Sequence, residues 1–292
     1  MKNRSVELVA NAGAIHSVGD GFRVHTFFPS SYRLDMYRMS PFILLDYNPK
    51  IHFAPSQTPR GVGVHPHRGF ETVTIAYKGK VQHHDSSGGG GVIEEGDVQW
   101  MTAASGVLHK EYHEEEWSKK GGDFQMVQLW VNLPAKDKMS APKYQALKSA
   151  EINKYKIDDA GSEIGVIAGD FNGVKGSAVT FSPVNLLNIK LKSGTELPLS
   201  FPEKFNTALL VIEGEVLVNG TEKVLADSLA LMANDGEGFK IKAVNDSVVL
   251  VLSGEPINEP LVAHGPFVMN TKQEIIQAFQ DFENGKFGYL ED

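Results

Sequence analysis

Residues 72–81 read TVTIAYKGKV, a run of β-branched and aromatic residues that ends in a glycine-containing turn. Such runs favour a β-strand followed by a reversal of the chain. The pattern returns 135 positions later, where residues 207–216 read TALLVIEGEV. A second pair follows at an offset of 131, with VIEEGDVQWM at residues 92–101 and KVLADSLALM at residues 223–232. A period of about 130 residues that occurs twice predicts two copies of one β domain.

The length and composition agree with this organisation. The chain has 292 residues, which is enough for two domains of ordinary size. Its 29 glycines and 14 prolines punctuate short strand-like runs, so antiparallel sandwiches or barrels are favoured over a parallel α/β sheet. A polar segment bounded by prolines at 134 and 142 resembles a linker. We therefore predict a first domain over residues 1–134, a linker over residues 135–145 and a second domain over residues 146–292.

One α-helix is predicted near the C-terminus, over residues 272–284. The preceding TKQE at residues 271–274 matches a capping box, in which a hydroxyl and a carboxylate satisfy free backbone amides. Ile275, Phe279 and Phe282 then recur at helical spacing, and Asn284 with Gly285 provides a stop. A weaker helical pattern covers residues 149–155.

The overall composition excludes several classes of function. The chain has no cysteine, which excludes disulfide scaffolds, thiolate metal sites and cysteine nucleophiles. A net charge of −8 argues against direct binding to nucleic acid. No apolar run has the length of a membrane span, and no secretory leader is visible, so the sequence predicts a cytoplasmic protein.

The ten histidines are unevenly distributed, and seven of them lie between residues 52 and 113. His65 and His67 are separated by one residue, which on a strand places both imidazoles on the same face. His109 and Glu111 repeat this spacing some forty residues later. Two such pairs could enclose one divalent ion. For a single pair the alternative is a set of inert, hydrogen-bonded histidines on a half-buried strand.

Other polar residues in this region have more ordinary interpretations. His83 and His84 precede a hairpin-like DSSG sequence and are expected to be solvated loop residues. His113 is followed by three glutamates and is expected to lie where the chain leaves the domain through a polar surface. The four glycines at 88–91 lack the Lys-Ser/Thr of a phosphate-binding loop.

Longer stretches around these residues carry a family resemblance. They are GVHPHRGFET at 63–72, GDVQWM at 96–101, GVLH at 106–109, LWVNLPAK at 129–136, GPFVMNT at 265–271 and residues 282–288. Together they closely resemble the pirin family, a branch of the bicupins. The resemblance covers nearly the whole chain and is thin only between about 150 and 260.

This resemblance implies an all-β fold of two tandem cupin domains, which are small, jelly-roll-like antiparallel barrels, with a short C-terminal helix. It also implies one divalent metal ion in the first domain, held by His65, His67, His109 and Glu111. Fe(II) is the expected ion, and Mn, Ni, Cu, Co and Zn are alternatives because three imidazoles and a carboxylate suit several metals. Glu71, where many cupins carry a carboxylate ligand, is ranked below Glu111 and expected outside the ligand set.

Pirins include enzymes with quercetin 2,3-dioxygenase activity. The resemblance therefore implies a dioxygenase that opens flavonol rings with O₂ and releases carbon monoxide. Glu111 would bind the ion and also take the proton of the flavonol hydroxyl. The alternative is a metal-containing regulatory protein that binds protein partners without significant turnover, and a weaker one is a non-redox isomerase. The expected partners are a flavonol-like substrate and O₂, or a protein, with no direct contact to nucleic acid or membrane.

The internal repeat predicts that the second domain holds no metal. At the offsets above, the four candidate ligands His65, His67, His109 and Glu111 align with Ser200, Pro202, Lys240 and Lys242, and Glu71 aligns with Asn206. Two lysines in these places would repel a divalent ion. We therefore expect one ion per chain.

Overall fold

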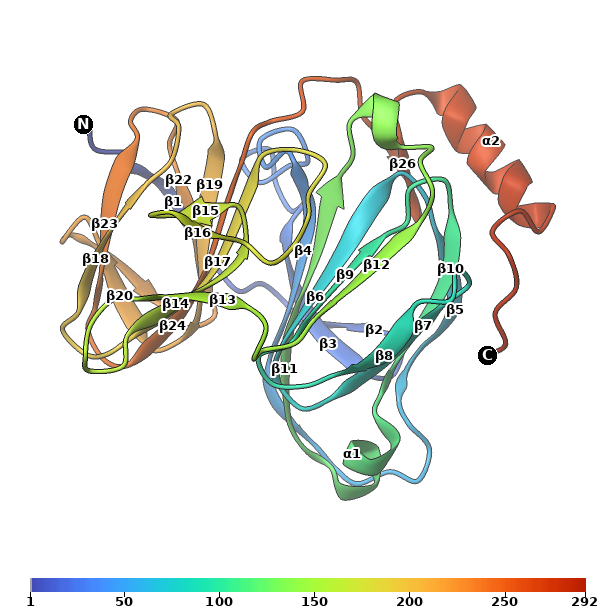
Figure 1. Ribbon diagram of the computed structural model, residues 1–292, viewed down its shortest axis with the longest axis horizontal. Helices are drawn as coiled ribbons and strands as arrows, with labels where there is room; N and C mark the ends of the chain where they lie inside the picture. The colour runs from blue at the N-terminus through green and yellow to red at the C-terminus, as the bar shows by residue number, and fades with distance from the viewer. Residues whose placement is uncertain (1) are drawn as a thin grey trace. The chain divides into compact units, whose positions relative to one another are not determined.

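The computed structural model describes residues 2–292 and divides the chain into two compact units, each built mainly of β-strands (Figure 1). One unit, here called the first barrel, comprises residues 14–29, 42–149 and 257–292. The other, here called the second barrel, comprises residues 2–13, 30–41 and 150–256. The predicted all-β fold with a short C-terminal helix is confirmed.

The first barrel contains, within the described residues, a seven-stranded and a four-stranded antiparallel sheet, to which the C-terminal segment adds a two-stranded hairpin. In spatial order the larger sheet contains β12 (Lys143–Leu147), β9 (Val98–Thr102), β6 (Phe70–Lys78), β11 (Gly122–Asn132), β4 (Phe42–Phe53), β3 (Phe22–Phe28) and β2 (His16–Val18). The smaller contains β5 (Gly61–His67), β10 (Val107–His113), β7 (Val81–Asp85) and β8 (Gly90–Ile93). Apolar residues fill the end of this barrel near α1 (Glu115–Lys120), among them Phe22, Phe53 and Phe124.

The second barrel repeats this arrangement within its described residues, 2–13, 30–41 and 150–256. Its seven-stranded sheet contains β1 (Val6–Asn11), β22 (Ser228–Met232), β19 (Asn206–Glu213), β24 (Ser247–Gly254), β17 (Val184–Leu191), β14 (Glu163–Ala168) and β13 (Asn153–Lys156). Its four-stranded sheet contains β18 (Glu196–Ser200), β23 (Gly238–Ala243), β20 (Glu215–Val218) and β21 (Glu222–Leu225), and a small hairpin joins β15 (Asp170–Phe171) to β16 (Val174–Lys175). The predicted duplication of one β domain is therefore present in the structure.

The N-terminal segment belongs to the second barrel, so the predicted boundaries are wrong at this end. Strand β1 pairs antiparallel with β22. Ahead of it, the buried Arg4 guanidinium donates to Thr207 Oγ1 and to the carbonyl oxygens of Phe205 and Gly236. A buried guanidinium needs its donors satisfied, and the carbonyls of the second barrel provide the acceptors.

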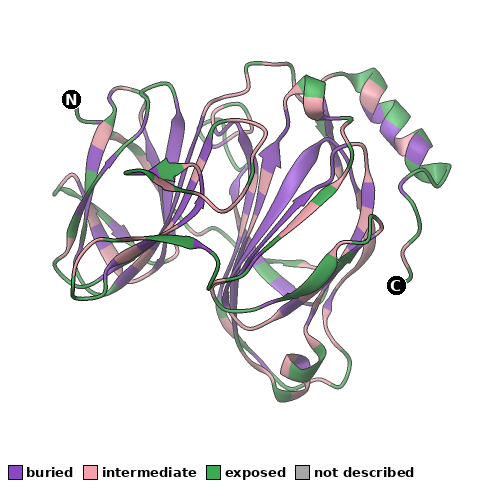
Figure 2. Cartoon of the chain, viewed as in Figure 1, coloured by how far each residue is buried: buried purple, intermediate pink, exposed green. Residues whose placement is uncertain are grey.

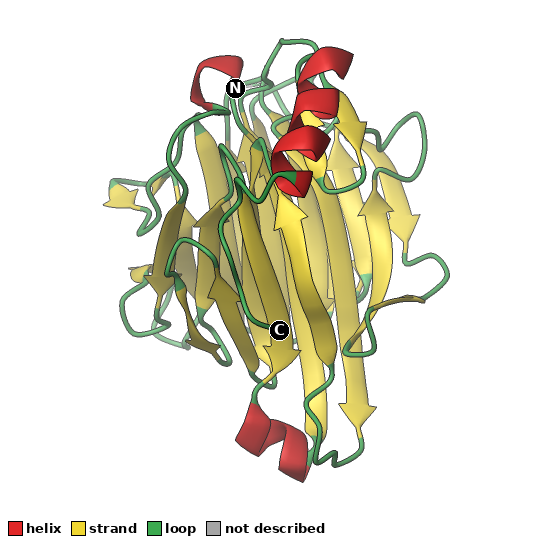
Figure 3. Cartoon of the chain, turned by 90° about the vertical axis from the view of Figure 1, so that its right-hand side faces the viewer, coloured by secondary structure: helices red, strands yellow, loops and turns green. Residues whose placement is uncertain are grey.

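The C-terminal segment belongs to the first barrel, which corrects the prediction at the other end. Hairpin β25 (Val262–His264) and β26 (Phe267–Met269) and helix α2 (Lys272–Glu283) pack with Phe287 in an apolar cluster of that barrel. Figure 3 shows α2 on the outer side of the strands of the first barrel. Each chain end thus belongs to the barrel formed mainly by the other half of the sequence. The N-terminal strand is part of the second barrel, and the C-terminal hairpin and helix are part of the first.

The segment predicted as a linker is also part of the first barrel. It begins with the short 3-10 helix η1 (Ala135–Asp137) and runs into β12, which pairs with β9. Between them, the buried Lys138 ammonium donates to Gly69 O, Asn132 Oδ1 and Val268 O. After this segment, the chain passes back to the second barrel at residue 150.

The helix predictions have different outcomes. Helix α2 has the predicted capping box, in which Thr271 Oγ1 accepts from Glu274 N and Glu274 Oε2 accepts from Thr271 N. Of the predicted apolar stripe, Ile275 is buried, but Phe282 is 39% exposed. Residues 149–155 form no helix, because a turn there leads into strand β13.

Burial follows the strands in both barrels. Figure 2 shows buried residues concentrated along the strands and exposed residues in the connecting loops. Among residues 2–292, no helix is both long and apolar enough to cross a membrane.

Candidate metal centre

Strands β5 and β10 bring the predicted residues together in the first barrel. His65 and His67 lie on β5, and His109 pairs directly with His65 across the antiparallel ladder. A register shift follows between His109 and Glu111, so that Glu111 pairs with Val62. Two neighbouring strands therefore supply all four side chains, and the pairing of these strands is irregular between His109 and Glu111.

The three histidines form one compact cluster. One ring nitrogen from each of His65, His67 and His109 lies within 4.8 Å of the others. The Nε2 atoms of His67 and His109 are 3.0 Å apart. His65 Nδ1 lies 2.8 Å from Gly63 O, so that a proton on Nδ1 leaves the Nε2 lone pair free.

The protonation of this cluster suits metal binding. Burial, together with the neighbouring imidazoles, holds the pKa of His67 and of His109 well below the usual range. Both rings are therefore neutral at pH 7, and a neutral imidazole is the form that ligates metals. Together with His65 and Glu111 they offer three imidazole nitrogens and a carboxylate, donors that fit a divalent transition metal.

Glu111 is held by two polar neighbours. Thr74 Oγ1 lies 3.3 Å from Glu111 Oε1, and Gln128 Nε2 lies 3.4 Å from Oε2. Glu111 also forms a second group of potential ligand atoms with His109 and His83, again within 4.8 Å of one another. It joins this group rather than the three-histidine cluster, and His109 is common to both.

A cavity of about 310 Å³ opens onto these side chains. His65, His67 and Glu111 line it together with Gln128 and Asp46. The remaining wall is apolar and consists of Val18, Phe22, Val24, Leu44, Val62, Met126 and Trp130. The arrangement is a polar cluster at one side of an apolar pocket, as in small-molecule binding sites.

Comparisons with known proteins agree with this architecture. The model of the family described as "Pirin" matches residues 21–131, and that of the "Pirin C-terminal cupin domain" matches residues 186–288. A relative from Pseudomonas aeruginosa, named "Putative quercetin 2,3-dioxygenase PA2418", is 50% identical over 272 residues, which are 93% of this chain and 94% of the relative.

The chain belongs to the pirin family.

Further pirins and solved structures are similar over most of their length. Human pirin is 37% identical, over 94% of this chain and 90% of its own. A crystal structure titled as quercetin 2,3-dioxygenase from Acinetobacter baumannii matches with a TM-score of 0.93 at 48% identity, over 99% of this chain and 100% of its own. The bacterial pirin YhhW from Escherichia coli, solved with nickel(II), has a TM-score of 0.66 at 21% identity over 86% of this chain and 99% of its own, which shows a common fold.

His83 is a site residue that the sequence interpretation missed. Its side chain is fully buried, and its Nδ1 lies 3.3 Å from His109 Nδ1. The alternation of side chains along β7 could have indicated its burial, because His83 lies two residues from the apolar Val81 and therefore on the same face of the strand. Val81, His83 and Asp85 are buried, and the residues between them are exposed or half-buried. His84, one residue on, is exposed as expected.

His113 and Glu71 lie elsewhere. His113 is fully buried among aromatic rings, including Phe53 and Phe124, and its Nε2 donates to Gly21 O. The prediction that His113 lies on a polar surface is therefore wrong. Glu71 points to the face of β6 opposite Thr74, because the two are an odd number of residues apart. Burial raises the pKa of Glu71 to about 7.

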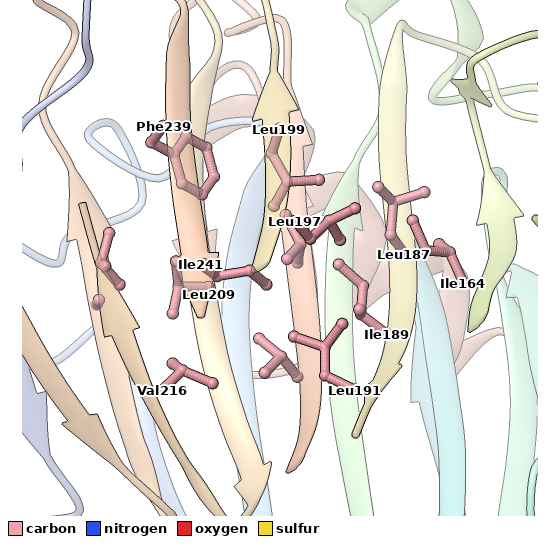
Figure 4. Packing of buried hydrophobic residues seen from close by; sticks show 14 of the residues in the cluster. Ile164, Leu187, Ile189, Leu191, Leu197, Leu199, Leu209, Val216, Phe239 and Ile241 are labelled. Atoms are coloured by element: carbon pink, nitrogen blue, oxygen red, sulfur yellow. The ribbon is translucent and has the colours of Figure 1, made fainter. Parts of the chain in front are cut away.

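The interior of the second barrel is apolar. Lys240 and Lys242 are exposed on β23, so the predicted repulsion between lysines and an ion does not arise. The inward positions of β18 and β23 are instead Leu197, Leu199, Phe239 and Ile241 (Figure 4). Among the described residues, both groups of potential ligands lie in the first barrel.

Proposed function

We propose that this chain is a dioxygenase that holds one divalent metal ion through His65, His67, His109 and Glu111 and acts on flavonol-like substrates with O₂. The observation that carries the proposal is the placement of the His65 and His67 imidazoles and the Glu111 carboxylate at a single apolar-walled cavity, with the His109 ring in the same histidine cluster. The names of similar proteins support the reaction class. When bound, a redox-active ion would supply Lewis acidity and electron transfer for dioxygen chemistry.

The cavity wall supports an aromatic substrate. Phe22, Met126 and Trp130 present apolar surface, and Trp130 is itself held by a stacked contact with Phe70. A planar polyphenol buried against these side chains would displace water from the pocket and lie beside the polar cluster. The volume of about 310 Å³ is at the lower end of the range of small-molecule pockets, roughly 300–1,000 Å³.

Glu111 is the side chain best placed to accept the substrate hydroxyl proton. Its contacts with Thr74 and Gln128, at 3.3 and 3.4 Å, are long, so a carboxylate oxygen can still accept a proton. Asp46, the other carboxyl group on the cavity wall, accepts a 2.5 Å hydrogen bond from Thr26 Oγ1. Asp46 is therefore already engaged.

The test combines elemental analysis with oxygen uptake across a panel of flavonols. We expect O₂-dependent turnover with release of carbon monoxide, and for Glu111→Gln a loss of about 10²-fold or more in kcat, the usual contribution of a general base. Glu71→Gln is the matched control, because it removes a buried carboxyl group from the opposite face of β6 and should retain activity. Product formed without O₂ would contradict the proposal, and so would metal-loaded protein that turns over none of the flavonols. The second result would favour the regulatory alternative.

A further inference from the structure

We propose that Asp85 and His83 form a buried positioning pair that fixes the orientation and proton position of His109, and thereby sets how tightly the ion is held. This inference rests on the proposed metal site but not on the substrate. His83 and His109 have no exposed surface, and Asp85 is 4% exposed. The His83 side chain lies between the other two, with one ring nitrogen facing Asp85 and the other facing His109 of the three-histidine cluster.

The two ring nitrogens of His109 face different partners. Nε2 lies 3.0 Å from His67 Nε2, within the three-histidine cluster. Nδ1 lies 3.3 Å from His83 Nδ1, on the other side of the ring. His83 therefore contacts the nitrogen of His109 that points away from His67.

A count of protons fixes the arrangement. If His109 Nε2 offers its lone pair to an ion, the single proton of the neutral ring lies on Nδ1. That proton must be donated to His83 Nδ1, which places the proton of His83 on Nε2. His83 Nε2 faces Asp85 Oδ2 at 3.6 Å, longer than a hydrogen bond but close enough for a strong attraction to a carboxylate.

Hydrogen bonds to one oxygen of the Asp85 carboxylate leave the other oxygen facing His83. Asp85 Oδ1 accepts from Ser87 N, Ser87 Oγ and Gly89 N, at 2.8, 2.5 and 3.1 Å. Its Oδ2 and His83 Nε2 are buried and have no hydrogen-bond partner in the structure, and they face one another. Burial alone would raise the pKa of Asp85, but the contacts with His83, Ser87 and Gly89 outweigh it and lower the pKa to about 2. The carboxylate is therefore charged at neutral pH.

The glycine-rich run at 88–91 has a structural role beside this pair. A Cβ at Gly89 would lie 2.3 Å from Asp85 Oδ2 and 2.9 Å from Tyr144 Cβ, so a side chain does not fit. Tyr144 in turn stacks on His83, with ring centroids 5.5 Å apart and an angle of 4° between planes. The loop and Tyr144 thus hold Asp85 and His83 in place.

The consequence is a dependence of metal affinity on residues that do not touch the ion. Partners of this kind raise the basicity of the ligating imidazole and prevent the ring from turning, and their loss typically weakens metal binding by about 10–100-fold. His109 is the ligand affected, because its other ring nitrogen is the one that His83 contacts.

The experiment measures zinc dissociation constants by chelator competition for the full-length protein and three variants. Asp85→Asn and His83→Gln should each weaken zinc binding by about 10–100-fold, while His84→Ala, on the same strand but exposed, should stay within about twofold. In the zinc-loaded wild type, ¹⁵N NMR of the histidine rings should show the proton of His109 on Nδ1 and that of His83 on Nε2. Asp85→Asn should perturb the His83 signals, which a merely structural role would not do selectively.

Three results would overturn the inference. Unchanged zinc affinity in folded Asp85→Asn and His83→Gln would refute the positioning role and leave the proposed metal site intact. Two zinc ions per wild-type chain, with one lost in His83→Gln, would make His83, His109 and Glu111 a second ligand set instead. A wild-type protein that binds no ion would refute this inference together with the proposed function.

Discussion

Arg68 and Asp281 form a buried ion pair that joins the histidine-bearing segment to the C-terminal helix of the first barrel. Arg68 Nη1 donates to Asp281 Oδ2 at 2.9 Å, and both side chains are less than a tenth exposed. Arg68 Nε also donates to Ser105 O, and the guanidinium lies 4.6 Å from the centroid of the Phe287 ring. Because Arg68 directly follows His67, this contact ties the docking of α2 to the position of a candidate ligand.

Asp281→Ala should therefore destabilise the first barrel. Removal of the carboxylate leaves the Arg68 charge buried without its partner, which costs about 3–5 kcal/mol. Urea unfolding should show this loss, and amide hydrogen exchange in α2 should accelerate. The matched control is Glu283→Ala, two residues on and exposed, which should change the free energy of unfolding by less than about 0.5 kcal/mol. Equal effects of the two substitutions would show that the ion pair does not hold the helix.

Glu71 should make stability fall as the pH rises from about 4.5 to 7. Burial raises its pKa to about 7, against an ordinary value of 4.5, while a hydrogen bond from Thr102 Oγ1 acts in the opposite direction. Between these values the folded protein keeps the proton and the unfolded chain loses it, so the stabilisation is complete below pH 4.5 and is lost towards pH 7. The difference amounts to about 3 kcal/mol.

The variant Glu71→Gln, which cannot ionise, isolates this effect. The difference in free energy of unfolding between wild type and Glu71→Gln should shift in favour of the variant as the pH rises from 4.5 to 7. Chemical unfolding at several pH values measures it. A difference that stays constant over this range would mean that Glu71 titrates normally in the folded protein.

Local patterns in the sequence predicted much of this fold. Strand runs and turn glycines depend on near neighbours, and so does the capping box of Thr271 and Glu274, which predicts the start of α2. The assignment of the chain ends to barrels was not accessible in this way. It depends on contacts such as Arg4 with Thr207 and Arg68 with Asp281, which join residues more than 200 positions apart.

The facing of side chains on a strand explains two of the wrong expectations, the alignment of the repeat in the second barrel and the exposure of His83. In the second barrel the repeat was aligned on Ser200 and Lys240, whereas the inward residues are their neighbours Leu199 and Phe239. A slip of one residue exchanges the two faces of a strand, so a pattern of residue types alone does not fix which face is inside. The burial of His83 was missed for the same reason, because its inward direction follows from its phase with Val81 rather than from its polarity.

The metal content should be one ion per chain, because the inward strand positions of the second barrel carry apolar residues in place of ligands. His67→Ala should reduce the content of protein loaded with a single divalent metal to well below one. Lys240→Ala is the control, since this side chain is exposed and paired with Glu196 outside the barrel interior. Elemental analysis against protein concentration measures the ratio. A ratio near two, or full loading of His67→Ala, would contradict the assignment.

The interior of the second barrel should behave as a packed core, separate from the candidate metal centre. Ile241 is fully buried within the apolar cluster between its two sheets (Figure 4). Ile241→Ala should lower the free energy of unfolding of this barrel by about 2–5 kcal/mol, because the shortened side chain leaves a cavity that neighbouring residues fill only in part. Lys242→Ala, the exposed neighbour on β23, is the control and should stay within about 0.5 kcal/mol. Since the candidate ligands all lie in the first barrel, zinc affinity measured below the unfolding transition should be the same in wild type and Ile241→Ala, and a weaker affinity would show that the second barrel contributes to the site.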